Sequence, residues 1–170
     1  MKILEQLQKV FTAFFLVIIV LSMLTWLGVI NPFDRFESAT SGVVEDKLRV
    51  SALAGDSDAQ NKLGTLLYKQ AEKHNSDFSE AINWFNEAHR QGHPIAQANL
   101  GFAYKAGNGV AQSNDKAIEH FYQSGLNFLR IGFPMDAKDN VYSISKIDTA
   151  HPLKLDLITA IKAYEENADP

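Results

Sequence analysis

The sequence predicts an all-α protein, a short solenoid of antiparallel helix pairs preceded by one transmembrane helix. Three observations support this fold class. Residues 54–67 and 91–104 share the skeleton G-x-x-x-A-Q-x-x-L-G at a spacing of 37 residues, and a fixed period of this length is typical of helical repeat arrays. Apolar residues downstream recur with the period of 3.6 that marks amphipathic helices. One uncharged run near the N-terminus is long enough to cross a membrane.

Composition excludes several classes of protein. The chain has 170 residues, a formal net charge of −4 and no cysteine. Without cysteine there is no disulfide and no thiolate metal site. A nucleic-acid-binding protein usually carries a basic surface, so the acidic balance argues against that class. The length and apolar content fit one globular domain together with one apolar segment.

The apolar segment extends from Val10 to Ile30 and contains no charged residue. About 20 apolar residues in a helix cross the hydrocarbon core of a bilayer, and Trp26 suits its downstream interface. A cleaved signal peptide is the alternative, but its apolar region is usually about 7–15 residues long and ends at a small-x-small site. The following residues, NPFDRFESATSG, lack such a site, which favours an uncleaved anchor.

The basic residues predict the orientation of this anchor. Lys9 directly precedes the apolar run, with Lys2 and the terminal amine further upstream, whereas the first basic residue downstream is Arg35. Positive charge favours the cytoplasmic side, so the N-terminus is expected in the cytoplasm and the rest of the chain in the periplasm of a bacterial inner membrane. The chain then divides into a stub and anchor (1–30), a linker (31–42), a repeat region (43–125) and a C-terminal helical cap (126–170).

Five helices are expected in the repeat region, and further helices in the cap. Glycine suits a helix end, Asp or Ser a helix start, and proline the first turn, which assigns Gly55, Asp56 or Ser57, Gly92 and Pro94 to these roles. Asn114 or Asp115 is expected to cap the last helix of the region. The expected helices are 43–53, 58–71, 78–91, 95–105 and 114–129, followed in the cap by one after the break at 132–134 and one from about 152.

Small residues on the first helix of each pair indicate close packing. Gly64 and Gly101 leave room for the partner helix, where Phe85 and Phe121 lie at matching positions. The Trp84 and Phe85 pair could instead be an exposed binding surface, but its spacing next to Ala81 and Ala88 favours the core.

The pattern A-Q-x-x-L-G-x-x-Y-x-x-G-x-G-V followed by A-x-x-x-F/Y resembles the Sel-1-like repeat, a relative of the tetratricopeptide repeat. The first unit departs from the pattern at Leu67 and in the turn that follows it, and the second at His120, where the first has Trp84. The resemblance covers about residues 45–125 and implies a protein that binds or scaffolds other proteins. The second unit matches at Ala96, Gln97, Leu100, Gly101, Tyr104, Gly107, Gly109, Val110, Ala117 and Phe121.

Few residues occur in a pattern that suggests catalysis or metal binding. His89 and His93 have the i, i+4 spacing of metal ligands, but Gly92 and Pro94 interrupt the helix and no third ligand is evident. His120 is more simply a packed or surface residue than a base. Nucleophile, zinc-protease, phosphate-loop and dinucleotide motifs are missing from the sequence. We therefore expect no catalytic residue, cofactor, metal or small-molecule substrate.

Partner contacts are expected on the concave face formed by the first helices. When Ala59 and Leu63 point inward, other side chains of these helices point away from the core. Phe102 either anchors a partner segment or packs on a neighbouring helix. The candidate partner-binding residues are Lys62, Thr65, Lys69, Asn99, Phe102 and Lys105.

These features favour a membrane-anchored, protein-binding adaptor without chemistry of its own, which holds a peptide or small domain at the inner membrane. An immunity protein against a toxin delivered to the periplasm is one form of this role, and an envelope scaffold is another. The alternative is an accessory or regulatory subunit of an enzyme complex for envelope or polysaccharide synthesis. Self-association through residues 10–30 is less favoured, since they lack a G-x-x-x-G pair.

Overall fold

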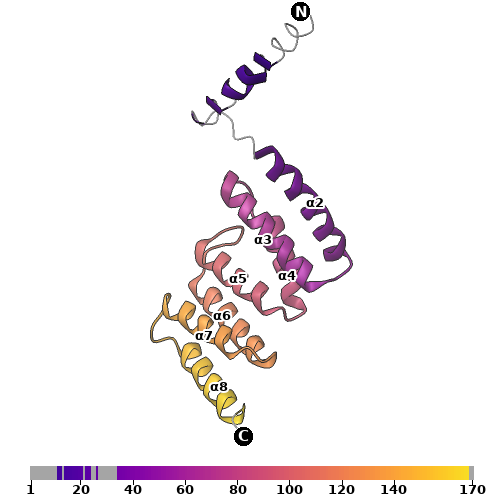
Figure 1. The fold of residues 1–170 in the computed structure, drawn as a ribbon. Helices are drawn as coiled ribbons and strands as arrows, with labels where there is room; N and C mark the ends of the chain where they lie inside the picture. The colour runs from indigo at the N-terminus through magenta and orange to yellow at the C-terminus, as the bar shows by residue number, and fades with distance from the viewer. Residues whose placement is uncertain (1–10, 13, 21, 24–25, 27–33, 169–170) are drawn as a thin grey trace, which may run out of the picture. The chain divides into compact units, whose positions relative to one another are not determined.

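The computed structural model describes residues 11–12, 14–20, 22–23, 26 and 34–168 (Figure 1). By their contacts, residues 1–44 and 45–170 form two separate compact units. Every regular element between residues 34 and 168 is a helix, as the sequence predicts. The helices are α2 (Asp34–Leu53), α3 (Ser57–His74), α4 (Ser79–Arg90), α5 (Pro94–Ala106), α6 (Asn114–Arg130), α7 (Pro134–Ser145) and α8 (Pro152–Ala168).

In the second unit, α3 to α8 stack in chain order as three helix pairs (Figure 1). The first helices, α3, α5 and α7, each pair with the helix that follows, and α4 and α6 also pack on the first helix of the next pair. Each helix buries one face and leaves the other to solvent. Stacking therefore makes a continuous core from units that could not bury their apolar faces alone.

One turn geometry recurs before each first helix. Gly55, Gly92 and Gly132 all have a positive φ, between 76° and 93°. Each glycine N–H donates to the carbonyl three residues earlier, and the next N–H donates to the carbonyl five residues before it, as in a Schellman motif. The turn at Gly132 is a third copy that the 37-residue period does not reveal, because it follows Gly92 by 40 residues.

Glycines on the first helices allow the close approach that the sequence predicts. A Cβ atom on Gly64 would lie 2.7 Å from the Phe85 ring, and one on Gly101 would lie 2.8 Å from the Phe121 ring. The ring of each second helix thus packs directly on the backbone of its partner. Phe85 and Phe121 are both fully buried, so Phe85 belongs to the core and Trp84 packs beside the neighbouring cluster.

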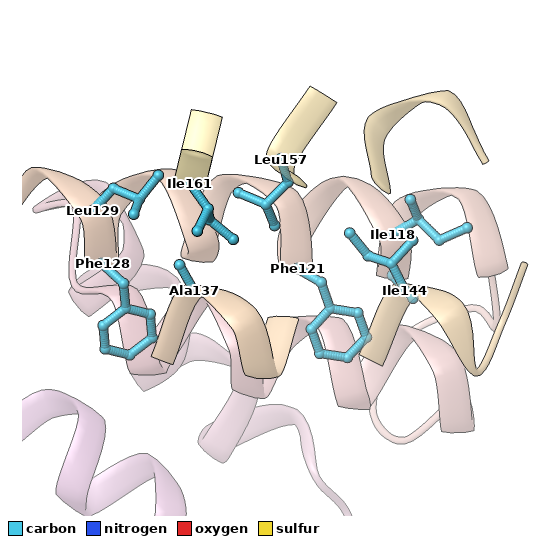
Figure 2. Close-up of a cluster of buried hydrophobic side chains, with 9 residues drawn as sticks. Ile118, Phe121, Phe128, Leu129, Ala137, Ile144, Leu157 and Ile161 are labelled. Atoms are coloured by element: carbon cyan, nitrogen blue, oxygen red, sulfur yellow. The ribbon is translucent and has the colours of Figure 1, made fainter. Parts of the chain in front are cut away.

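The C-terminal pair closes the stack with the largest apolar cluster of the described residues. Phe121 and Phe128 of α6 lie against Ala137 and Ile144 of α7, and α8 adds Leu157 over the top (Figure 2). Gly125 faces Leu157 as closely as Gly101 faces Phe121. Helix α6 therefore continues five residues past the predicted boundary at residue 125 and belongs to both the repeat region and the cap.

Two helix starts differ from the predictions. Helix α2 begins at Asp34, although the sequence predicts a linker over 31–42 and a helix from residue 43. Ser, Thr and Gly lower helix propensity only modestly, so they do not prevent the helix from extending. The cap of α6 is Ser113, whose hydroxyl accepts from the Lys116 N–H, rather than Asn114 or Asp115. Asp56 caps α3 as expected.

The predicted membrane segment, residues 10–30, lies in part outside the described residues. Its described residues are helical, and the large apolar side chains among them are exposed. Within the described residues, no helix combines the length and the apolar character that crossing a bilayer requires.

The glycine contacts lead to a first prediction. Replacing Gly101 by Ala places a methyl group inside the contact distance of the Phe121 ring, so the free energy of unfolding should fall by about 1–3 kcal/mol. Gly42→Ala is the matched control, because a Cβ atom there meets nothing within 4 Å and alanine favours a helix. Urea unfolding checks both variants, and equal stability of the two would contradict the packing described.

Candidate functional site

Four of the six predicted partner-binding residues line one depression between α3 and α5. Its volume is about 280 Å³, and it lies on the solvent side of these first helices. Lys62 and Lys105 are exposed but do not line the depression. The residues that line it are Thr65, Tyr68, Lys69, Glu72, Phe85, Asn99 and Phe102.

Phe102 combines the two predicted alternatives. Its ring packs edge-on against the buried Phe121 ring, with 4.9 Å between the centroids and 73° between the planes. The side chain nevertheless stays 50% exposed. Its contact with Phe121 holds the ring in one orientation, while its free part borders the depression. An aromatic ring that is already ordered loses less entropy when it binds a partner.

Tyr68 forms the other aromatic wall of the depression. Its ring lies 4.8 Å from Phe78 and 6.2 Å from Phe85, between centroids, and its hydroxyl accepts a 2.7 Å hydrogen bond from the Asn108 side chain. Tyr68 and Glu72 were not among the residues predicted from the sequence. Positions i, i+3, i+4 and i+7 share a helix face, so continuing the pattern from Thr65 would have found both residues.

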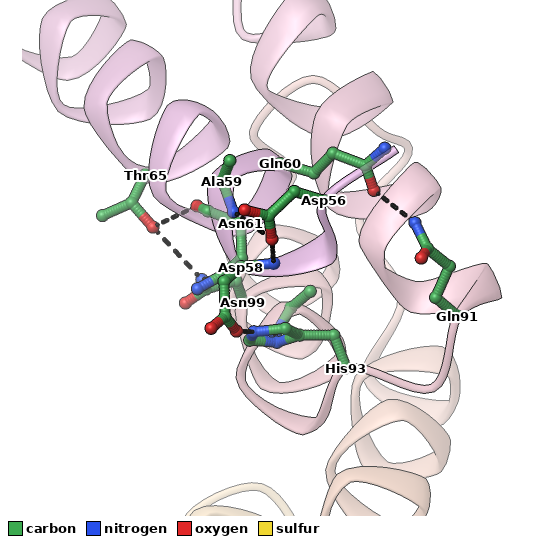
Figure 3. Close-up of polar contacts among 10 residues, drawn as sticks. Asp56, Asp58, Ala59, Gln60, Asn61, Thr65, Gln91, His93 and Asn99 are labelled. Atoms are coloured by element: carbon green, nitrogen blue, oxygen red, sulfur yellow. Dashed lines mark hydrogen bonds and ion pairs between the residues drawn. The ribbon is translucent and has the colours of Figure 1, made fainter. Parts of the chain in front are cut away.

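Polar contacts hold α3 and α5 together beside the depression (Figure 3). The Asn99 amide donates to Asn61 Oδ1 at 3.0 Å and to Thr65 Oγ1 at 3.5 Å, and the Thr65 hydroxyl donates to the Asn61 carbonyl. Asn61 is buried, so these bonds satisfy groups that would otherwise be costly to remove from water. Asn99 is therefore a structural bridge as well as a lining residue.

The repeated glutamine of the A-Q skeleton has a structural role as well. Gln60 accepts from Gln91, the C-cap of α4, at 2.8 Å (Figure 3). It also donates to the Ala52 carbonyl of α2 at 3.1 Å. Gln97, also buried, accepts from Asn127 of α6. These side chains connect helices rather than contact solvent, so they are not candidates for partner binding.

The two histidines with ligand-like spacing point to different neighbours. His93 caps α5 through Nδ1, which accepts from the Ala96 N–H, and its Nε2 lies 2.9 Å from Asp58 Oδ1 (Figure 3). Since Nδ1 is an acceptor, Nε2 carries the proton and donates to the carboxylate. His89 instead faces His120 of α6. Within the described residues, no group of three or more histidine, aspartate or glutamate side chains is placed to hold a metal ion.

His89, Tyr104 and His120 form an aromatic cluster where α4, α5 and α6 meet. The two imidazoles lie 5.4 Å apart edge to face, and Tyr104 stacks on His120 at 5.2 Å, with Lys116 over the Tyr104 ring. His89 Nδ1 is buried without a hydrogen-bond partner. Burial lowers the pKa of both histidines, and Arg90 lowers that of His89 further. For His120, His89 and Lys116 also lower the pKa, while the Glu119 carboxylate opposes them.

One known protein family matches the part of the chain from α3 into α6. Residues 57–93 and 94–126 each match the Sel1 repeat, and the two matches cover α3 with α4, and α5 with most of α6. No curated protein matches the chain. The crystal structure of a Sel1 repeat protein from Oxalobacter formigenes aligns with 69% of this chain and 86% of that chain, at 25% sequence identity and a TM-score of 0.49.

The histidine cluster predicts that stability depends on pH. Unfolded histidine has a pKa of about 6.5, and the native values are lower, so the unfolded chain binds more protons as the pH falls below this value. The stability contributed by the two neutral rings is complete above about pH 6.5 and is lost as the pH falls through the native pKa values. Thermal unfolding between about pH 7.5 and 5 should show this decrease.

His120→Phe should reduce the slope of melting temperature against pH, because one of the two partly buried imidazoles is removed. His74→Gln is the control, since His74 is exposed at the end of α3. If His74→Gln reduces the slope as much as His120→Phe does, the pH dependence does not come from the histidine cluster.

Proposed function

We propose that this chain is a protein-binding adaptor that holds a partner through the depression between α3 and α5. The observation that carries the proposal is the half-exposed Phe102 ring, ordered by Phe121 at the edge of a depression with an aromatic floor. Sel1 repeats generally mediate protein–protein interaction, which supports a binding role. Around this depression the Thr65 hydroxyl bonds to the Asn61 carbonyl and the Tyr68 hydroxyl to the Asn108 side chain, not to Lys69 or Glu72, so we propose no reaction for it.

The size of the depression suits a short segment of a partner. A volume of about 280 Å³ accommodates one or two large apolar side chains. Aromatic residues in such positions often dominate the binding energy, while the charged rim, here Lys69 and Glu72, contributes mainly to orientation. The cargo we propose is therefore a peptide segment or one element of a small domain.

We further propose that residues 10–30 anchor this adaptor in a bacterial inner membrane. The segment has 21 residues without a charge, and the apolar side chains described within it are exposed. Lys2 and Lys9 favour a cytoplasmic N-terminus and a periplasmic repeat region. Anchoring confines both partners to one surface, so a weak contact at the depression can suffice.

Several biological roles use the same surface. An immunity protein would bind a toxin that reaches the periplasm, and a scaffold or accessory subunit would hold an envelope or polysaccharide-synthesis enzyme. All of them require the same depression to bind one protein at the membrane. The partner identified by capture from detergent-solubilised membranes decides among them.

Phe102→Ala tests the binding site. Removing the ring should weaken capture of the partner by about tenfold or more, as for central aromatic anchors. The loss of the edge contact with Phe121 should lower the free energy of unfolding by only about 1 kcal/mol. Leu155→Ala is the control, because Leu155 is also an exposed apolar residue but lies on α8. Unchanged capture with intact helical content would reject this depression as the site.

A double substitution, Ile18→Asp with Ile19→Asp, tests the anchor. Each carboxylate at the centre of a transmembrane helix costs about 2.5–3.5 kcal/mol, so the full-length chain should leave the membrane fraction. The control is Lys47→Asp, which changes the charge outside the apolar run. If the chain sediments with membranes in all three forms, or is soluble before substitution, the anchor is wrong.

A further inference from the structure

One stripe of α5 faces solvent along the length of the helix. Ile95, Asn99 and Phe102 occupy positions i, i+4 and i+7 and therefore share one face. Ile95 is 48% exposed and Phe102 is 50% exposed, which is unusual for large apolar side chains on a helix inside a stack. At a rise of 1.5 Å per residue, they lie about 10.5 Å apart along the helix axis.

Each of these two residues borders its own depression. Phe102 borders the one described above. Ile95 borders a second depression of about 330 Å³, where the N-terminal ends of α5 and α7 meet the C-terminal end of α6. Its apolar lining includes Phe128, Ile131 and Phe133, and the last of these is 54% exposed. The surface thus offers two apolar sites joined by one helix face.

The helices α3 and α5 are joined by polar contacts along this surface. The Asn61 to Asn99 hydrogen bond lies at the edge of the depression at Phe102, and the Asp58 to His93 contact is part of the lining of the depression at Ile95 (Figure 3). These bonds keep the two first helices in register, so the distance between the depressions does not depend on a partner. A preformed spacing is what allows a surface to select its ligand by geometry.

The two depressions differ in the charged residues around them. Asp58 and Asp136 line the depression at Ile95, and no lysine or arginine is among its described lining residues. The Asp58 side chain is 70% exposed. At the Phe102 end, Lys69 lines the depression beside Glu72, and Lys105 lies exposed one turn after Phe102. The first end is therefore acidic, while the second has two cations and one anion.

We propose that the occupant of this surface is an amphipathic helix of the partner protein, with two large apolar residues at i and i+7. A Lys or Arg of that helix lies next to Asp58 and Asp136, and an acidic residue lies next to Lys69 and Lys105. This inference rests on the proposed function and names the partner class of the same surface. Residues i and i+7 of a helix lie on one face about 10.5 Å apart, whereas residues on one face of an extended strand lie about 6.6 or 13 Å apart.

Binding of synthetic peptides to the full-length chain in detergent micelles tests this proposal. The probe is a labelled helical peptide of about 16 residues with phenylalanine and leucine at i and i+7, arginine beside the first and glutamate beside the second. One comparison peptide moves the second apolar residue to i+5, and another exchanges the arginine and glutamate. Fluorescence anisotropy should show binding of the first peptide and about tenfold weaker binding of the other two.

Variants of the protein give the matching result. Asp136→Lys should weaken binding of the first peptide and strengthen binding of the charge-exchanged peptide. Asp139→Lys, an exposed change on the same helix, should leave the order of their affinities unchanged. Equal binding of all three peptides, or no binding of any, overturns the helical occupant. The proposed function fails separately, when Phe102→Ala leaves capture of the natural partner unchanged.

Discussion

In each of the first two helix pairs, the contact between a glycine of the first helix and a buried aromatic ring of the second sets the rest of the structure. Gly101 lies directly on Phe121, so α5 and α6 approach more closely than any residue with a side chain would allow. The adjacent residue on α5, Phe102, then meets the edge of the same ring. One buried phenylalanine thus supports both the core of the second repeat and the aromatic wall of its candidate site. Packing and binding surface are for this reason not independent in this chain.

The sequence predicts the helical repeat region well, because its signals are local. Period, caps and small residues act within a few residues, and they locate α3 to α6 and the Gly101 to Phe121 contact. The break at 132–134 was predicted, but not that Gly132 repeats the turns at Gly55 and Gly92, because its spacing from Gly92 differs and Phe133 replaces a polar cap. The early start of α2 was missed since weak propensities do not forbid a helix.

The candidate site is only partly visible in the sequence. Facing positions on α3 and α5 follow from helix geometry, which is why four of the six predicted residues border one depression. The place of Tyr68 on this face follows from the same geometry, but its hydrogen bond to Asn108, 40 positions distant, does not, nor does the bond of Asn61 to Asn99 on another helix. The pairing of His89 with His120 likewise arises only when α4 and α6 meet. Such contacts require the relative placement of helices, which periodicity does not give.

A photo-reactive amino acid placed at chosen positions of the full-length chain in living cells tests the central claim most directly. Crosslinking at Ile95 and at Phe102 should capture the same protein, because the account assigns both positions to one binding surface. The same amino acid at Leu155 on α8 should not capture that protein. Capture at Leu155 alone, or of unrelated proteins at Ile95 and Phe102, would contradict the claim that the first-helix face binds one partner.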